Sequence, residues 1–216
     1  NDDVFVMPSS GGDIKQLTFH DNFDQVDNWS WDNKTIYFTS GRMGRYSAYK
    51  INREGGSPVR LFDNYFNTVH DVTERPNGEL FFNETFESKN QAYRKGYKGA
   101  YNPDIQSWNA STKEFKKYTD YNGKDMWPTI DKQGNIYFVS DEGNGQYNLY
   151  TFTDNAKTAL TNFPVSIHYP VVNAEGGIIV FEKDYQVYKY DVTTKTTTKV
   201  PIHVVSNRVT EKEKDF

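Results

Sequence analysis

The sequence predicts an all-β fold, a β-propeller built from four-stranded antiparallel blades. Aromatic residues are abundant, with 16 tyrosines, 15 phenylalanines and 4 tryptophans in 216 residues, and such side chains pack well on pleated, half-buried sheets. A short β-branched and aromatic run also recurs four times, each time after turn-forming residues. Strand-length runs between such turns are typical of hairpins, and a repeat of roughly 40 residues is the length of one blade.

The repeating unit is clearest between residues 24 and 62. We expect its four strands over residues 24–31, 35–40, 46–52 and 59–62. The breaks contain Asn33, Gly41 and the Gly55-Gly56 pair, which are residues that adopt turn conformations readily. This segment therefore predicts one complete blade.

The second strand of the unit returns along the chain. It reads IYF at 36–38, LFF at 80–82, IYF at 136–138 and IVF at 179–181, with starts 44, 56 and 43 residues apart. Third strands are predicted over residues 46–52, 103–109, 147–153 and 185–191, and last strands over 57–62, 114–119, 157–162 and 196–201. Four repeats with the same order of elements predict four complete blades.

Residues 3–18 match only the second half of a unit, with strands expected over residues 4–6 and 14–18. We therefore expect about four and a half blades in a propeller domain spanning residues 1–204. The predicted units are a partial blade at 1–20, blades at about 21–62, 63–119, 120–162 and 163–204, and a linker at 205–216. Because a propeller closes its ring, we expect either preceding sequence or a return of residues 204–209 to complete the first blade.

Composition and motifs narrow the possible functions. The net charge of −4 argues against nucleic-acid binding through phosphate contacts, and no apolar run reaches the roughly 20 residues of a membrane span. The chain has no cysteine and contains neither a GxSxG elbow nor an HExxH zinc motif. We expect no catalytic residue, no metal and no cofactor.

One position just ahead of each first strand is a candidate binding site. Aligning the blades on their turns places Val26, His70, Met126 and His168 at this position. The residues that follow them are Asp27, Asp71, Trp127 and Tyr169. First strands line the channel of a propeller, so His70 and His168 would lie near one mouth and could contact a ligand. The alternative is that both histidines only hydrogen-bond a neighbouring blade.

A long insertion separates the second and third strands of one blade, between Glu84 and Pro103. Loops this long are uncommon and are often functional, although a solvated surface loop is the alternative. The insertion interleaves tyrosines with four basic residues, Lys89, Arg94, Lys95 and Lys98.

Two segments resemble the propeller repeats of the TolB and tricorn families: DVFVMPSSGGDIKQLT at 3–18 and WSWDNKTIYFTS at 29–40. The order of further features is similar to the first propeller of tricorn-like serine peptidases. These features are QLTFHD at 16–21, YRKGYKGAYNPDIQSWN at 93–109, the segment 124–152 and KVPIHVVSNRV at 199–209. Together they cover almost the whole chain.

The resemblance implies a six-bladed ring that guides or gates peptides, without catalysing their cleavage, toward a peptidase core elsewhere in the same polypeptide. The partners it implies are peptides or unfolded protein segments and the other domains of that polypeptide. It also implies that basic residues such as Arg94 and Lys95 hold a peptide carboxylate. By the same resemblance the compartment is periplasmic or otherwise extracytoplasmic, with the cytoplasm as the alternative. Two other functions remain open, a TolB-like protein-interaction propeller and a carbohydrate-binding propeller.

Overall fold

A computed structural model describes residues 2–62 and 68–203, which form four four-stranded sheets and one two-stranded sheet. The half-blade pairs β1 (Phe5–Val6) with β2 (Lys15–Gln16). The first blade contains β3 (Asp24–Trp29), β4 (Thr35–Ser40), β5 (Ser47–Asn52) and β6 (Val59–Arg60). The second contains β7 (His70–Glu74), β8 (Leu80–Asn83), β9 (Gln106–Asn109) and β10 (Glu114–Lys117). The third contains β11 (Asp125–Ile130), β12 (Ile136–Ser140), β13 (Asn148–Thr153) and β14 (Ala156–Ala159). The fourth contains β15 (Ile167–Val172), β16 (Ile178–Lys183), β17 (Gln186–Asp191) and β18 (Thr196–Lys199).

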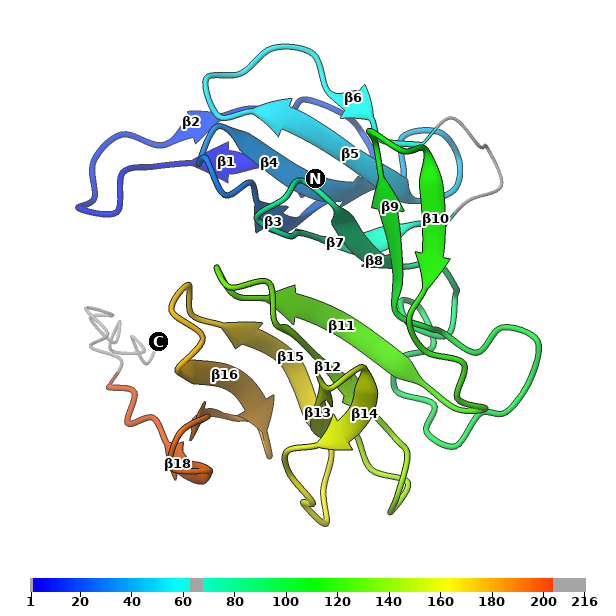
Figure 1. Cartoon of the computed structure of the whole chain (residues 1–216). Helices are drawn as coiled ribbons and strands as arrows, with labels where there is room; N and C mark the ends of the chain where they lie inside the picture. Colours follow the sequence, from blue (N-terminus) through cyan, green and yellow to red (C-terminus); the bar gives the residue numbers. More distant parts are fainter. Residues whose placement is uncertain (1, 63–67, 204–216) are drawn as a thin grey trace, which may run out of the picture.

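Within each blade, antiparallel strands pair in chain order, and the first strands meet at the centre. Strand β7 packs against both β3 and β11, and β11 packs against β15, so the blades follow one another around a shared axis (Figure 1). The predicted propeller with four-stranded blades is confirmed. Among the described strands the half-blade does not contact the fourth blade, and the ring of six blades stays a prediction. The suggested return of residues 204–209 and the linker at 205–216 lie outside the described residues.

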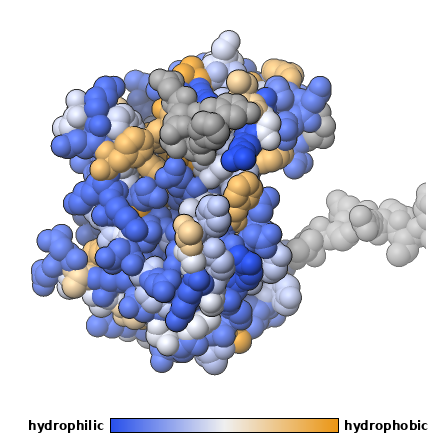
Figure 2. All heavy atoms as spheres, turned by 90° about the vertical axis from the view of Figure 1, so that its right-hand side faces the viewer, coloured by the Kyte–Doolittle hydropathy of each residue, from blue (hydrophilic) through white to orange (hydrophobic). Residues whose placement is uncertain are grey.

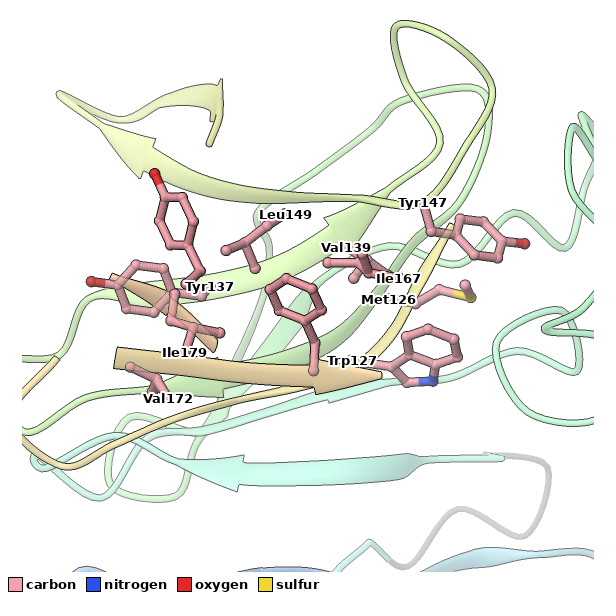
Figure 3. Close-up of a cluster of buried hydrophobic side chains, with 11 residues drawn as sticks. Met126, Trp127, Tyr137, Val139, Tyr147, Leu149, Ile167, Val172 and Ile179 are labelled. Carbon is pink, nitrogen blue, oxygen red and sulfur yellow. The ribbon is translucent and has the colours of Figure 1, made fainter. Parts of the chain in front are cut away.

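The core is divided into layers between neighbouring blades. The largest cluster joins the third and fourth blades, with Trp127 and Tyr147 at one end and Tyr137 and Val172 at the other (Figure 3). Strands β8 and β12 are buried along their whole length because neighbours cover both faces. In β16 buried and open positions alternate, because the third blade covers only one of its faces.

A polar side chain at each joint between complete blades accepts a backbone N–H from the next blade. Asp27 accepts from Val72 at 3.2 Å, and Thr129 accepts from Val172 at 3.2 Å. Asn83 does more, because its side chain accepts from Trp127 and also donates to two carbonyl groups. These bonds satisfy buried backbone groups and fix the level at which adjacent first strands meet.

Candidate functional site

Each first strand carries a β-bulge at the position that the sequence alignment singled out, which lies within the strand and not just ahead of it as predicted. The register shifts after Val26, His70, Met126 and His168. The following residues Asp71, Trp127 and Tyr169 have left-handed backbones, with φ of 54°, 57° and 51°. Such a conformation costs a residue other than glycine about 1–3 kcal/mol and is common at functional sites. Bulges also change the direction in which side chains point. At this height along the channel, the side chains that line it therefore differ from those that a regular strand would present.

A pocket of about 260 Å³ lies at this level, and we call it the mouth pocket. It is lined by residues that include Gln25, Asp27, Asp71, Trp127 and Tyr169. The rings of Trp127 and Tyr169 lie 4.5 Å apart between centroids. Strand β11 begins at this end, on the right in Figure 1. Figure 2 views the molecule from that side and shows a largely hydrophilic surface with apolar residues in separate groups.

The two carboxyl groups of the mouth pocket are strongly perturbed. Burial, followed by repulsion from Asp71, raises the pKa of Asp27 to about 7. Burial raises the pKa of Asp71 to about 6. The hydroxyl of Thr39 donates to Asp27 at 2.8 Å, whereas Asp71 Oδ2 is buried without a hydrogen bond. The positive charge of Lys89 opposes both shifts and is therefore close to the pair.

His70 and His168 occupy different environments. The ring of His70 is fully buried, with Nδ1 2.6 Å from the carbonyl oxygen of Thr68 and Nε2 2.9 Å from the hydroxyl of Ser88. Burial lowers its pKa to about 3, so the ring is neutral. Both partners belong to the same blade as His70, so its ring packs within its own blade rather than bonding a neighbouring one. A direct contact with a ligand stays a prediction.

The half-buried ring of His168 lies beside the mouth pocket. Its centroid is 5.8 Å from that of Trp127, and its backbone pairs with Glu182 in β16. Burial lowers the pKa of His168, and the positive charge of Lys95 lowers it further. His168 and Lys95 are therefore near one another, although they are 73 positions apart in the numbering.

The insertion is held against the third blade by a buried ion-pair cluster. Lys124 Nζ is buried, lies 3.0 Å from Glu87 Oε2 and donates to the carbonyl oxygen of Gln91 at 2.6 Å. Arg94 also pairs with Glu87. The N–H of Gly96 donates to Asp141 at 3.1 Å. The insertion is therefore anchored along its length rather than projecting freely into solvent.

The four basic residues of the insertion have separate positions. The guanidinium of Arg94 is half-exposed and stacks over Tyr97 at 4.3 Å, so part of its charge is already used by Glu87. Lys95 donates to Gln146 at 2.8 Å on the third blade, and Lys98 is exposed. Lys89 donates to Gln25 at 2.6 Å, at the edge of the mouth pocket. The structure thus brings Lys89 to the edge of the mouth pocket and Lys95 to the third blade, where its charge acts on His168, while Arg94 supports the insertion.

The carboxyl pair predicts a pH-dependent stability. In the folded chain, Asp27 binds its proton up to about pH 7 and Asp71 up to about pH 6, whereas in the unfolded chain both lose their protons near pH 4. The folded state then binds more protons between these limits, so the free energy of unfolding falls as the pH rises through that range. We expect thermal unfolding curves to show a decrease in Tm from about pH 5 to about pH 8.

Asp27→Asn should flatten this decrease, and the exposed control Asp154→Asn should leave it unchanged. Apart from the substituted residues the three proteins have the same titratable groups, so the difference between the curves isolates the pair. Equal slopes for the parent and Asp27→Asn would contradict the prediction.

Comparison with known proteins places the chain in a family. Residues 1–196 match the family model described as the tricorn protease N-terminal beta propeller domain. The chain belongs to this family. It is 31% identical over 213 residues to a tricorn protease homolog of Saccharolobus solfataricus (strain ATCC 35092 / DSM 1617 / JCM 11322 / P2). That match covers 95% of the chain but 19% of the relative, so the chain spans about a fifth of the relative's length.

Solved structures show the same fold. The crystal structure of the tricorn protease superposes with a TM-score of 0.77 at 19% identity, over 94% of this chain and 20% of that one. TolB from Acinetobacter baumannii gives a TM-score of 0.71 at 19% identity, over 88% of this chain and 46% of that one. The tricorn propeller family therefore accounts for the sequence resemblance, and the structural likeness to TolB shows the shared fold alone.

The sequence predicted the height along the channel at which the candidate site lies, but it did not predict which charged residues lie together there. The alignment found the bulge position, and Asp27 and Asp71 stood there as neighbours of the aligned residues. The available signal for the carboxyl pair was that two adjacent blades each carry an aspartate at the same position of the repeat. Contact between Lys89 and Gln25 had no such signal, because it joins residues 64 positions apart. Within residues 2–62 and 68–203 there is no helix long and apolar enough to cross a bilayer and no cluster of three or more potential metal ligands.

Proposed function

We propose that this tricorn-type propeller handles peptides without cleaving them and guides them through the mouth of its channel. The observation that carries the proposal is the anchored insertion, which holds Lys95 on the third blade, where its charge acts on His168 near a pocket lined by Trp127 and Tyr169. An ammonium group can bind a carboxylate through charge-assisted hydrogen bonds, and the aromatic rings offer apolar contact. Lys95 is the better candidate for a peptide carboxylate, because Arg94 already pairs with Glu87.

The test is peptide handling by the full-length protein with Lys95→Ala. We expect the parent to prefer peptides with a free C-terminal carboxylate over C-terminally amidated ones by about tenfold, the size of one charge-assisted contact. Lys95→Ala should reduce this preference to less than about threefold. Cleavage rates measure the preference if the full-length protein is a peptidase, and calorimetric Kd values measure it in either case.

Lys50→Ala is the matched control, because Lys50 is an exposed lysine on β5. It should retain the parent's preference. If Lys95→Ala retains the preference as well, Lys95 does not bind the carboxylate. If the parent itself ignores amidation, carboxylate capture at this mouth is ruled out.

A further inference from the structure

The mouth pocket contains more negative than positive charge. Asp27 and Asp71 both line it, and both are ionised above about pH 7. The nearest cation from the insertion is Lys89, whose Nζ donates to the side chain of Gln25 rather than to either carboxylate. One ammonium cannot neutralise two carboxylates. The pocket is therefore one positive charge short when both acids are ionised.

The remaining walls of the pocket suit an organic cation. Trp127 is almost completely buried and presents its ring beside that of Tyr169, which is 58% exposed. Aromatic faces attract cations, and ammonium groups make strong hydrogen bonds with carboxylates. An anion would be repelled by Asp27 and Asp71. An uncharged sugar would leave the charge of the pair uncompensated.

Neighbouring titratable groups do not supply the missing charge. The ring of His70 lies 3.6 Å from Asp71 Oδ2 but is neutral, with both nitrogens in contact with other groups. On the fourth blade, His168 lies opposite Glu182 in the strand register, and burial lowers its pKa although the charge of Glu182 opposes that shift. Above about pH 7, where both acids are ionised, the described residues leave this charge for a bound cation to supply.

We propose that the mouth pocket binds a primary ammonium group of a peptide, through Asp27 and Asp71. This inference rests on the proposed function. It gives a binding site to the ammonium end of the same peptide whose carboxylate end Lys95 contacts. The ammonium can be the free N-terminus or a lysine side chain, which carry the same chemistry. A short peptide with both ends free would then span the mouth, with its ammonium at the first two blades and its carboxylate near the third and fourth.

The test is calorimetric titration of the full-length protein with Ala-Ala-Phe, its N-acetyl form and its C-terminal amide. N-acetylation should raise the Kd of the parent about tenfold. In Asp71→Asn the same modification should change the Kd less than about threefold. The exposed acid Asp154 gives the control Asp154→Asn, which should keep the tenfold effect. Asp27→Asn is the second variant, because its amide oxygen can still accept from the N–H of Val72.

The outcomes separate this inference from the proposed function. If N-acetylation raises the Kd by the same factor in the parent, in Asp27→Asn and in Asp71→Asn, ammonium binding at this pair is overturned. If C-terminal amidation does not change the Kd of the parent but N-acetylation does, carboxylate capture is overturned and the ammonium site stands. Absence of binding by every peptide overturns both. If N-acetyl-Ala-Lys-Phe binds as tightly as free Ala-Ala-Phe, the lysine side chain also serves as the ammonium.

Discussion

Asn83→Asp is expected to destabilise the protein by about 3–5 kcal/mol, although the side chain keeps its size and shape. Asn83 is fully buried, and its amide group donates to the carbonyl oxygens of Asp104 at 2.9 Å and of Asp125 at 3.0 Å. An aspartate has no N–H to donate to these acceptors and would place a negative charge against them. Only the bond from the N–H of Trp127, at 2.8 Å, would survive. Asn83 would therefore lose two of its three hydrogen bonds, one within the second blade and one that crosses to the third.

Thermal unfolding at neutral pH measures the effect, and a loss of this size corresponds to a decrease in Tm of about 10 °C for a chain of this length. The matched control is Asn77→Asp in an exposed turn, where the side-chain oxygen only accepts from the N–H of Glu79 and an aspartate can do the same. The Asn83→Asp defect should also shrink in acid, because protonation removes the buried charge. Equal Tm values for the two variants would show that Asn83 does not hold the joint together.

Much of this fold could be predicted because its determinants are local. Each blade is a set of hairpins, so the alternation of aromatic runs with Gly, Asn and Asp turns indicates the strands directly. The prediction extended the first strand to Trp31, whereas β3 ends at Trp29. In the structure the N–H of Trp31 donates to Glu74 of the second blade. A turn closed by the bond from the N–H of Asn33 to the carbonyl oxygen of Ser30 ends the strand, and the contact with Glu74 holds Trp31 against the next blade.

The candidate site could be predicted only in part, for a related reason. Its level in the channel follows from the repeat, because equivalent positions of a repeat lie at equivalent heights. Its chemistry depends on how different blades face each other, as Asp27 and Asp71 do across the first joint. Arg94 is the clearest case, since the sequence shows a cation among tyrosines, whereas the structure shows that cation paired with Glu87. Because of this pairing, Arg94 counts among the residues that anchor the insertion and not among those whose charge is available to a ligand.

Lys124→Met is expected to cost about 3–5 kcal/mol of stability and to loosen the insertion. The ammonium of Lys124 is buried and contacts the carboxylate and the carbonyl oxygen of Glu87 as well as the carbonyl oxygen of Gln91. Methionine has a similar length but supplies no charge and no hydrogen-bond donor. Glu87 would stay buried with Arg94 alone, a half-exposed partner, and the two carbonyl groups would lose their donor. Removing one member of a buried pair is costly because the other remains charged.

The loosened insertion has a direct readout, because Arg94, Lys95 and Lys98 are trypsin sites within it. Limited proteolysis should cut Lys124→Met at these positions well before the parent, and the preference for free C-terminal carboxylates should fall as Lys95 moves from His168. The double variant Glu87→Gln/Lys124→Met removes the stranded charge and should regain part of the Tm without restoring the preference. This combination distinguishes loss of buried charge balance from loss of the anchored geometry. Cleavage of Lys124→Met at the parent's rate would show that the insertion is held by its other contacts, those of Gly96 and Lys95 with the third blade.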